Sequence, residues 1–212
     1  MSATASQEPE NVETEELIPI EDLNSFLDQF MFRSYDIIKK QKPKTIIPVI
    51  TVYLRGDSPK YDVASRQVPP TVETEQIATM QAMGISTAKE FTSGGQVPVC
   101  AFLTTLGIRQ QSKVGTDLTE KELADNANEV LLISGATLDG RICQAVYDVS
   151  RNKKGNIIEL KLQLYMPPRP VVTEKSGVSN PLLAAFYSGF IEEYTNIRSE
   201  GGKRNGDIIL PD

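Results

Sequence analysis

The chain has 212 residues, of which 40% are hydrophobic and 24% are charged, values close to the average of folded globular proteins. It contains no histidine and no tryptophan. Without histidine, the chain cannot by itself build a Ser-His-Asp or Cys-His catalytic unit or a histidine-ligated zinc site.

The net charge of −6 is concentrated near the N-terminus. The first 24 residues contain no lysine or arginine, and their acidic residues are Glu8, Glu10, Glu13, Glu15, Glu16, Glu21 and Asp22. The rest of the chain is therefore almost neutral. Affinity for nucleic acids comes mainly from lysine and arginine contacts with phosphates, so we expect no nucleic-acid partner.

The two cysteines, Cys100 and Cys143, are too few for a disulfide framework or a four-thiolate zinc site. Both lie in apolar stretches, where a free cysteine usually packs as a small hydrophobic side chain. No loop with the spaced carboxylates of a calcium site is present. We therefore expect no metal and no cofactor.

The N-terminal segment has no basic region followed by an apolar run, which a secretory signal peptide requires. No apolar stretch reaches the ~18 residues expected of a transmembrane helix. We therefore expect a soluble, cytoplasmic protein with no membrane partner.

In chain order, residues 1–18 are polar, acidic and free of aromatic residues, which predicts a flexible arm. Residues 19–200 are predicted to form a single domain. Residues 201–212 are rich in glycine and charge, which predicts a flexible tail.

Apolar residues spaced three and four apart predict a first helix over residues 22–40. A β-branched run predicts a strand that starts near Val49, because Pro48 cannot donate a hydrogen bond to a sheet. A short strand is then expected over residues 61–68, a second helix over 73–90 and a further strand over 97–109. Gly84 weakens the apolar pattern of this second helix.

The C-terminal half predicts a meander of three antiparallel strands, preceded by a polar segment with one helical turn over residues 118–127. Asp139-Gly140 predicts a tight type I′ hairpin turn, which needs positive φ at both central residues. The strands are expected over residues 129–138, 141–150 and 156–166.

The last strand of the meander alternates apolar and polar residues, which predicts one buried and one solvated face. Pro167-Pro168 is predicted to end it. Asn180 is then expected to cap a final helix that has Pro181 in its first turn. The apolar residues of the alternation are Ile158, Leu160, Leu162 and Leu164.

Together these elements predict an α+β fold. We expect a mostly antiparallel sheet of about five strands with a C-terminal meander, packed on one face by two or three helices.

Three groups of residues are candidates for a reactive site. Cys143 alternates with Ala145 and Tyr147, so we expect it to be buried and unreactive. Arg141 and Asp148 are seven residues apart on one strand, which predicts opposite faces and an exposed or turn-proximal position. Ser93-Gly94-Gly95 precedes a strand instead of a helix, which favours a helix stop over a phosphate loop.

The final helix carries aromatic residues of the kind that anchor interfaces, and we expect a contact surface there. These are Phe186, Tyr187, Phe190 and Tyr194.

No catalytic group emerges, so the leading hypothesis is a non-catalytic binding or assembly protein that self-associates, for instance as a homodimer, or binds another protein. One alternative is a histidine-independent enzyme that uses carboxylates or hydroxyls. Another is a structural component of a virion or a larger bacterial machine.

Overall fold

The computed structural model describes residues 18–56, 60–92, 95–110, 127–138, 140–170 and 180–200. The helices are α1 (Ile20–Gln41), α2 (Gln76–Phe91), which a 3-10 turn over Glu73–Glu75 precedes, and α4 (Pro181–Glu200). The strands are β1 (Val49–Arg55), β2 (Asp62–Gln67), β3 (Val97–Gln110), β4 (Ala127–Thr137), β5 (Arg141–Arg151) and β6 (Ile157–Pro170).

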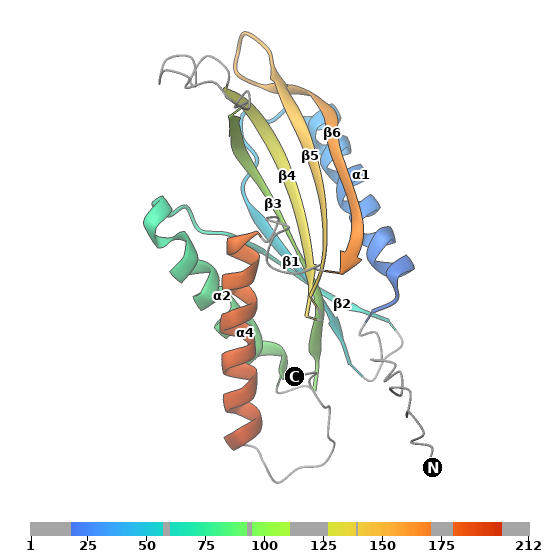
Figure 1. The fold of residues 1–212 in the computed structure, drawn as a ribbon. Coiled ribbons are helices and arrows are strands. Elements are labelled where there is room, and N and C mark those ends of the chain that lie inside the picture. The colour runs from blue at the N-terminus through green and yellow to red at the C-terminus, as the bar shows by residue number, and fades with distance from the viewer. Residues whose placement is uncertain are drawn as a thin grey trace, which may run out of the picture.

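The strands form one antiparallel sheet in the order β2-β1-β3-β4-β5-β6 (Figure 1). The predicted α+β class is confirmed, with six strands instead of about five. β4, β5 and β6 are the predicted meander. None of the described helices is both long and apolar enough to cross a membrane.

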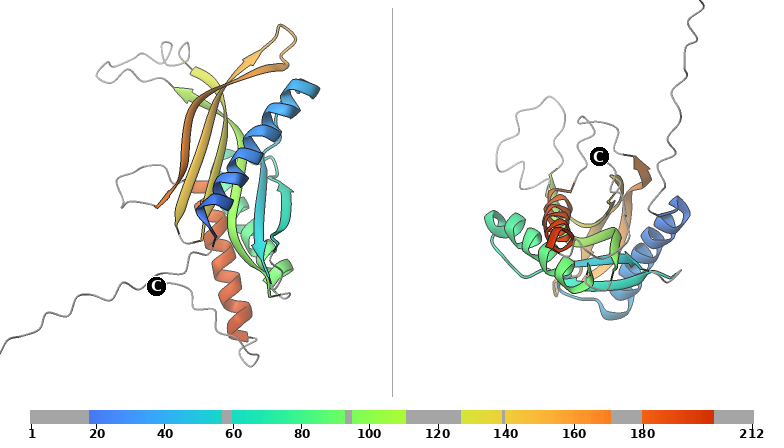
Figure 2. Two further views of the ribbon diagram at one scale, coloured as in Figure 1. Left: turned by 90° about the vertical axis from the view of Figure 1, so that its right-hand side faces the viewer. Right: turned by 90° about the horizontal axis from the view of Figure 1, so that it is seen from below.

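Helices cover both faces of the sheet, so the prediction that they pack on one face was wrong (Figure 2). On β3, Phe102 belongs to the core under α1, whereas its neighbour Ala101 belongs to the core under α2 and α4. On β1, Tyr53 likewise belongs to the core under α1, and Val52 belongs to the core under α2 and α4. Strands buried on both sides read as continuous apolar runs, as these two do.

Helix α1 covers its face of the sheet with a single buried stripe. Phe30 stacks on Phe102 of β3 with ring centroids 4.7 Å apart, and Phe26 stacks on Tyr53 of β1 at 3.8 Å. Each such pair contributes about 0.5–1.5 kcal/mol beyond its buried area. The stripe itself comprises Leu23, Leu27, Phe30, Ser34 and Ile38.

Helices α2 and α4 pack against each other on the opposite face through two glycines. A Cβ on Gly84 would overlap the carbonyl oxygen of Phe186, and a Cβ on Gly189 would overlap the carbonyl oxygen of Gln81. The two backbones therefore approach closely at this crossing. Gly84, which weakens the helical pattern in the sequence, is needed because any side chain there would push α4 away.

The β4–β5 hairpin does not have the predicted type I′ geometry. The Gly140 N–H donates to the Thr137 carbonyl at 3.2 Å, and Gly140 has φ +84°. This matches a three-residue loop in which a glycine of positive φ follows the turn. The Arg141 N–H then donates to Thr137 Oγ1 at 2.9 Å and closes the loop.

Strand β6 is an edge strand that continues past its predicted end, through Pro167 and Pro168 to Pro170. Proline cannot donate to a sheet, but an edge strand tolerates it. The register between β5 and β6 shifts three times, once each around Ile158, Gln163 and Pro167. The regular alternation expected for this strand is therefore interrupted.

Arg151 joins three segments at the end of the sheet near the β5–β6 hairpin. Its Nε and Nη2 each donate at 2.6 Å to Glu129 of β4. Its Nη1 donates to the carbonyl oxygens of Lys44 and Gly155, both at 2.6 Å. This side chain therefore links β4, the hairpin and the segment between α1 and β1.

Several sequence predictions lie outside the described residues. They concern the acidic arm up to residue 17, the Ser93-Gly94 pair, residues 118–126 of the expected helical turn, Asp139 and the tail over residues 201–212. The predicted cap of the final helix is confirmed, because Asn180 Oδ1 accepts the Leu182 N–H at 3.0 Å.

The glycine crossing of α2 and α4 predicts that Gly84→Ala and Gly189→Ala each destabilise the fold. Alanine favours an isolated helix over glycine by about 1 kcal/mol, but the overlap should cost more, leaving a net loss of about 1–3 kcal/mol. Urea denaturation measures it. Gly107→Ala on β3 is the matched control, since its Cβ would meet only a Val130 methyl at 3.9 Å. A rise in stability for Gly84→Ala would contradict the close approach.

Candidate functional site

The aromatic residues of α4 lie in the interior of the fold. Phe186, Tyr187, Phe190 and Tyr194 are no more than 8% exposed. They pack among residues of α2 and the sheet, and the Tyr187 hydroxyl donates to the Ala136 carbonyl at 2.7 Å. A partner could reach these four side chains only if α4 separated from α2, so a contact surface has to be sought elsewhere.

Cys143 lies in the core under α1, as its alternation predicts. It is 2% exposed, and Gly135 of β4 leaves room for its sulfur beside the ring of Phe102. Burial raises the pKa of the Cys143 thiol to about 12, against a smaller opposing effect of a backbone hydrogen bond with Gly135. The thiol is therefore protonated and enclosed. Cys100 is buried as well.

Arg141 is beside the β4–β5 turn, but it is buried and not exposed. Its Nη2 donates to the Ile18 carbonyl at 2.7 Å, on the α1 side of the sheet. Asp148 is seven positions along the same strand and is opposite Val130 and Lys161 in the sheet. The two side chains thus do not converge on one site. Arg141 instead fixes the residues that lead into α1.

Two cavities lie on the α2–α4 side. The smaller, about 190 Å³, is between the β4–β5 hairpin and α4, and its Ser134 and Gln144 side chains hydrogen-bond to each other at 3.3 Å. The larger, about 600 Å³, is near the starts of β1, α2 and α4. Its described lining contains no charged side chain; Met80, Leu103 and three prolines contribute to it. Among the described residues, no three His, Cys, Asp or Glu side chains cluster as metal ligands would.

The outer edge of β6 is the most apolar exposed element of the sheet. Only one of the four apolar residues of its sequence alternation, Leu160, is buried. The register shift around Gln163 places Leu162 opposite Tyr147 on the α1 face and Leu164 opposite Val146 on the other face. The half-exposed residues of β6 are Ile158 (45%), Leu162 (45%), Leu164 (46%) and Tyr165 (40%).

Helix α1 borders this edge. Burial raises the pKa of Tyr147 and of Tyr165, and the negative charge of Asp28 raises both further, which places Asp28 on the side of α1 toward β5 and β6. Tyr35 follows Asp28 by seven residues, so it lies on the same side of the helix. It is 52% exposed and belongs to the helix that contacts β6.

The sequence did contain a signal for this edge that the alternation concealed. Pro167, Pro168 and Pro170 fall in the same segment as Lys161, and prolines and lysines are typical of edge strands. The sheet order brings this segment to the outside. No described residue pairs with the outer side of β6.

Comparisons with protein-family models, with curated proteins and with solved structures each find no match.

The enclosed thiol of Cys143 predicts very slow modification in the native protein. With a pKa of about 12, the thiolate fraction at pH 8 is about 10⁻⁴, and burial blocks access as well. In a Cys100→Ala background, we expect labelling by a disulfide reagent to be at least ~1,000-fold slower in buffer than in urea.

The matched control is Ser150→Cys, which places a thiol at an exposed position of the same strand. This variant should label at the rate of a free thiol. Equally fast labelling of Cys143 in the native protein would show that β5 opens readily, or that the thiol is reactive.

Proposed function

We propose that the protein is a non-catalytic binding or assembly protein that self-associates through the β6 edge of its sheet. One observation carries the proposal: a 14-residue edge strand has four half-exposed apolar side chains. Long apolar edges are sites where another chain adds a strand, because their backbone N–H and C=O groups have no partner in the sheet.

The size of the apolar surface supports a reversible contact. Fully burying a large apolar side chain stabilises by about 1.5–3 kcal/mol, so four half-exposed side chains supply roughly 3–6 kcal/mol. Backbone hydrogen bonds across the edge add to this, and the loss of translational and rotational freedom opposes it. The contact is therefore expected to be reversible.

The opposite edge of the sheet is a weaker candidate. Strand β2 has only six residues, and its Arg66 side chain is bound to Ser86 and Glu90 of α2. Gln96 contacts Asp62 at the start of this strand. These side-chain contacts tie β2 to its own chain.

Self-association predicts a concentration-dependent dimer of the full chain in sedimentation equilibrium. Leu162→Lys places a charge in the middle of the β6 edge, so we expect it to weaken the dimer at least ~10-fold. Val63→Lys on β2 is the matched control, because Val63 is a 53% exposed apolar residue of the other edge strand. It should leave the dimer unchanged.

A wild-type chain that stays monomeric at several hundred micromolar would refute the proposal. Equal weakening by the two substitutions would also refute it, since the contact would then not be specific to β6.

A further inference from the structure

We propose that two copies join antiparallel through β6 around a two-fold axis at Leu160, so that Glu159 of each copy pairs with Lys161 of the other. The inference rests on the self-association proposed above and specifies its partner and register. The partner is a second copy of this chain, and the charge pattern of β6 selects the register.

Symmetry restricts where the axis can pass. A two-fold axis between antiparallel edge strands runs perpendicular to the sheet, so each residue faces a counterpart on the same side of the joined sheet. Because side chains alternate between the two sides along a strand, the axis must pass beside a residue. Each candidate axis therefore places one residue opposite its own copy.

The regular part of β6 is short. Glu159, Leu160, Lys161 and Leu162 pair one-to-one with Ser150, Val149, Asp148 and Tyr147 of β5, between two register shifts. This is the longest run of β6 without a register shift, since the next longest, over Leu164, Tyr165 and Met166, has three pairs. The axis is therefore sought at one of these four positions.

Charge distinguishes the four positions. An axis at Glu159 places that carboxylate opposite its own copy, and an axis at Lys161 does the same with the ammonium group. Like charges directly opposite each other destabilise a sheet. An axis at Leu162 moves the pairing across the register shift around Gln163.

An axis at Leu160 places unlike charges opposite each other at two positions, because each Glu159 then faces the Lys161 of the second copy. It also places Leu160 opposite its counterpart, so that all of these pairs lie between the register shifts around Ile158 and Gln163. Lys161 already faces Asp148 of β5 within its own chain, so it would lie between two carboxylates. Exposed ion pairs of this kind add little affinity, but they do select a register.

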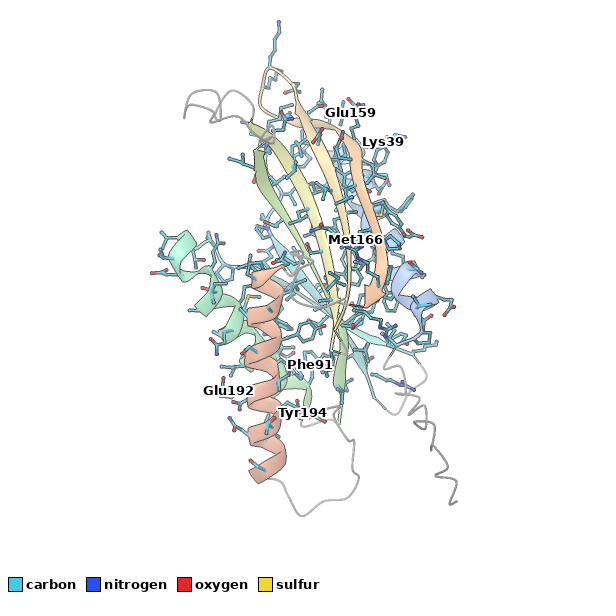
Figure 3. The ribbon with its side chains drawn as sticks, viewed as in Figure 1. Lys39, Phe91, Glu159, Met166, Glu192 and Tyr194 are labelled. Atoms are coloured by element: carbon cyan, nitrogen blue, oxygen red, sulfur yellow. The ribbon has the colours of Figure 1, made fainter. Side chains whose placement is uncertain are left out.

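Helix α1 extends the contact beyond the strand. Figure 3 labels Glu159 near the start of β6 and Lys39 in the last turn of α1, at the same end of the sheet. Tyr35 lies four residues before Lys39, about one helical turn away. Tyr35 is half-exposed, so in each copy α1 would offer an aromatic ring to the contact.

A charge-exchange experiment tests the register. Glu159→Lys gives two lysines per edge and Lys161→Glu gives two glutamates, so each variant alone should self-associate about 10-fold or more weakly at low salt. Mixing the two variants should form a mixed dimer of nearly wild-type affinity. The double variant E159K/K161E should also regain wild-type affinity. Sedimentation equilibrium and native mass spectrometry measure these species.

Two exposed residues away from β6 provide the controls. Glu75→Lys before α2 and Lys89→Glu near the end of α2 reproduce the same changes in net charge, and should leave the wild-type affinity unchanged. Circular dichroism of each variant checks that the fold is intact.

The outcomes separate the register from the proposed function. If the wild type dimerises but the single variants are unaffected, or neither mixing nor the double variant restores affinity, the register is wrong and self-association stands. If the wild-type chain is monomeric, both proposals fail.

Discussion

Burial of β3 on both faces determines how the rest of the molecule is arranged. Its alternate side chains enter two separate cores, so a single helical layer cannot cover the strand. Helix α1 supplies one cover through its aromatic stacks, and the α2–α4 pair supplies the other. The glycine crossing matters for the same reason, because α2 and α4 must approach closely before their apolar side chains can reach one face of β1 and β3 together.

This arrangement leaves the two edges of the sheet unequal. On one side, β2 is short and is bound to α2 by charged side chains. On the other side, α1 packs over β5 and β6 but leaves half of several β6 side chains exposed. The apolar residues that would be internal in a central strand are therefore at the surface. The binding function proposed for β6 would need no catalytic group.

Much of the fold could be predicted from local patterns. The helices, the meander and the Asn180 cap follow from periodicity and capping preferences. The prediction that helices cover only one face of the sheet was wrong, although the unbroken apolar runs of β1 and β3 indicate strands buried on both faces. The candidate site was missed for a different reason. Buried Phe186 and half-exposed Leu162 are both apolar residues in regular patterns, and only the packing of α4 and the strand order separate them. Register shifts in β6 also have no sequence signal as clear as a glycine turn.

The prolines at the end of β6 have a consequence for the size of any assembly. Pro167, Pro168 and Pro170 lack N–H groups, so the C-terminal part of the strand offers few donors to a neighbour. Only the first part of β6 can be extended, and a symmetric pair uses that part on both chains at once. The outer borders of the joined sheet would then be two β2 strands, each tied to its own α2. Growth would stop at two copies, giving a closed particle instead of an open filament.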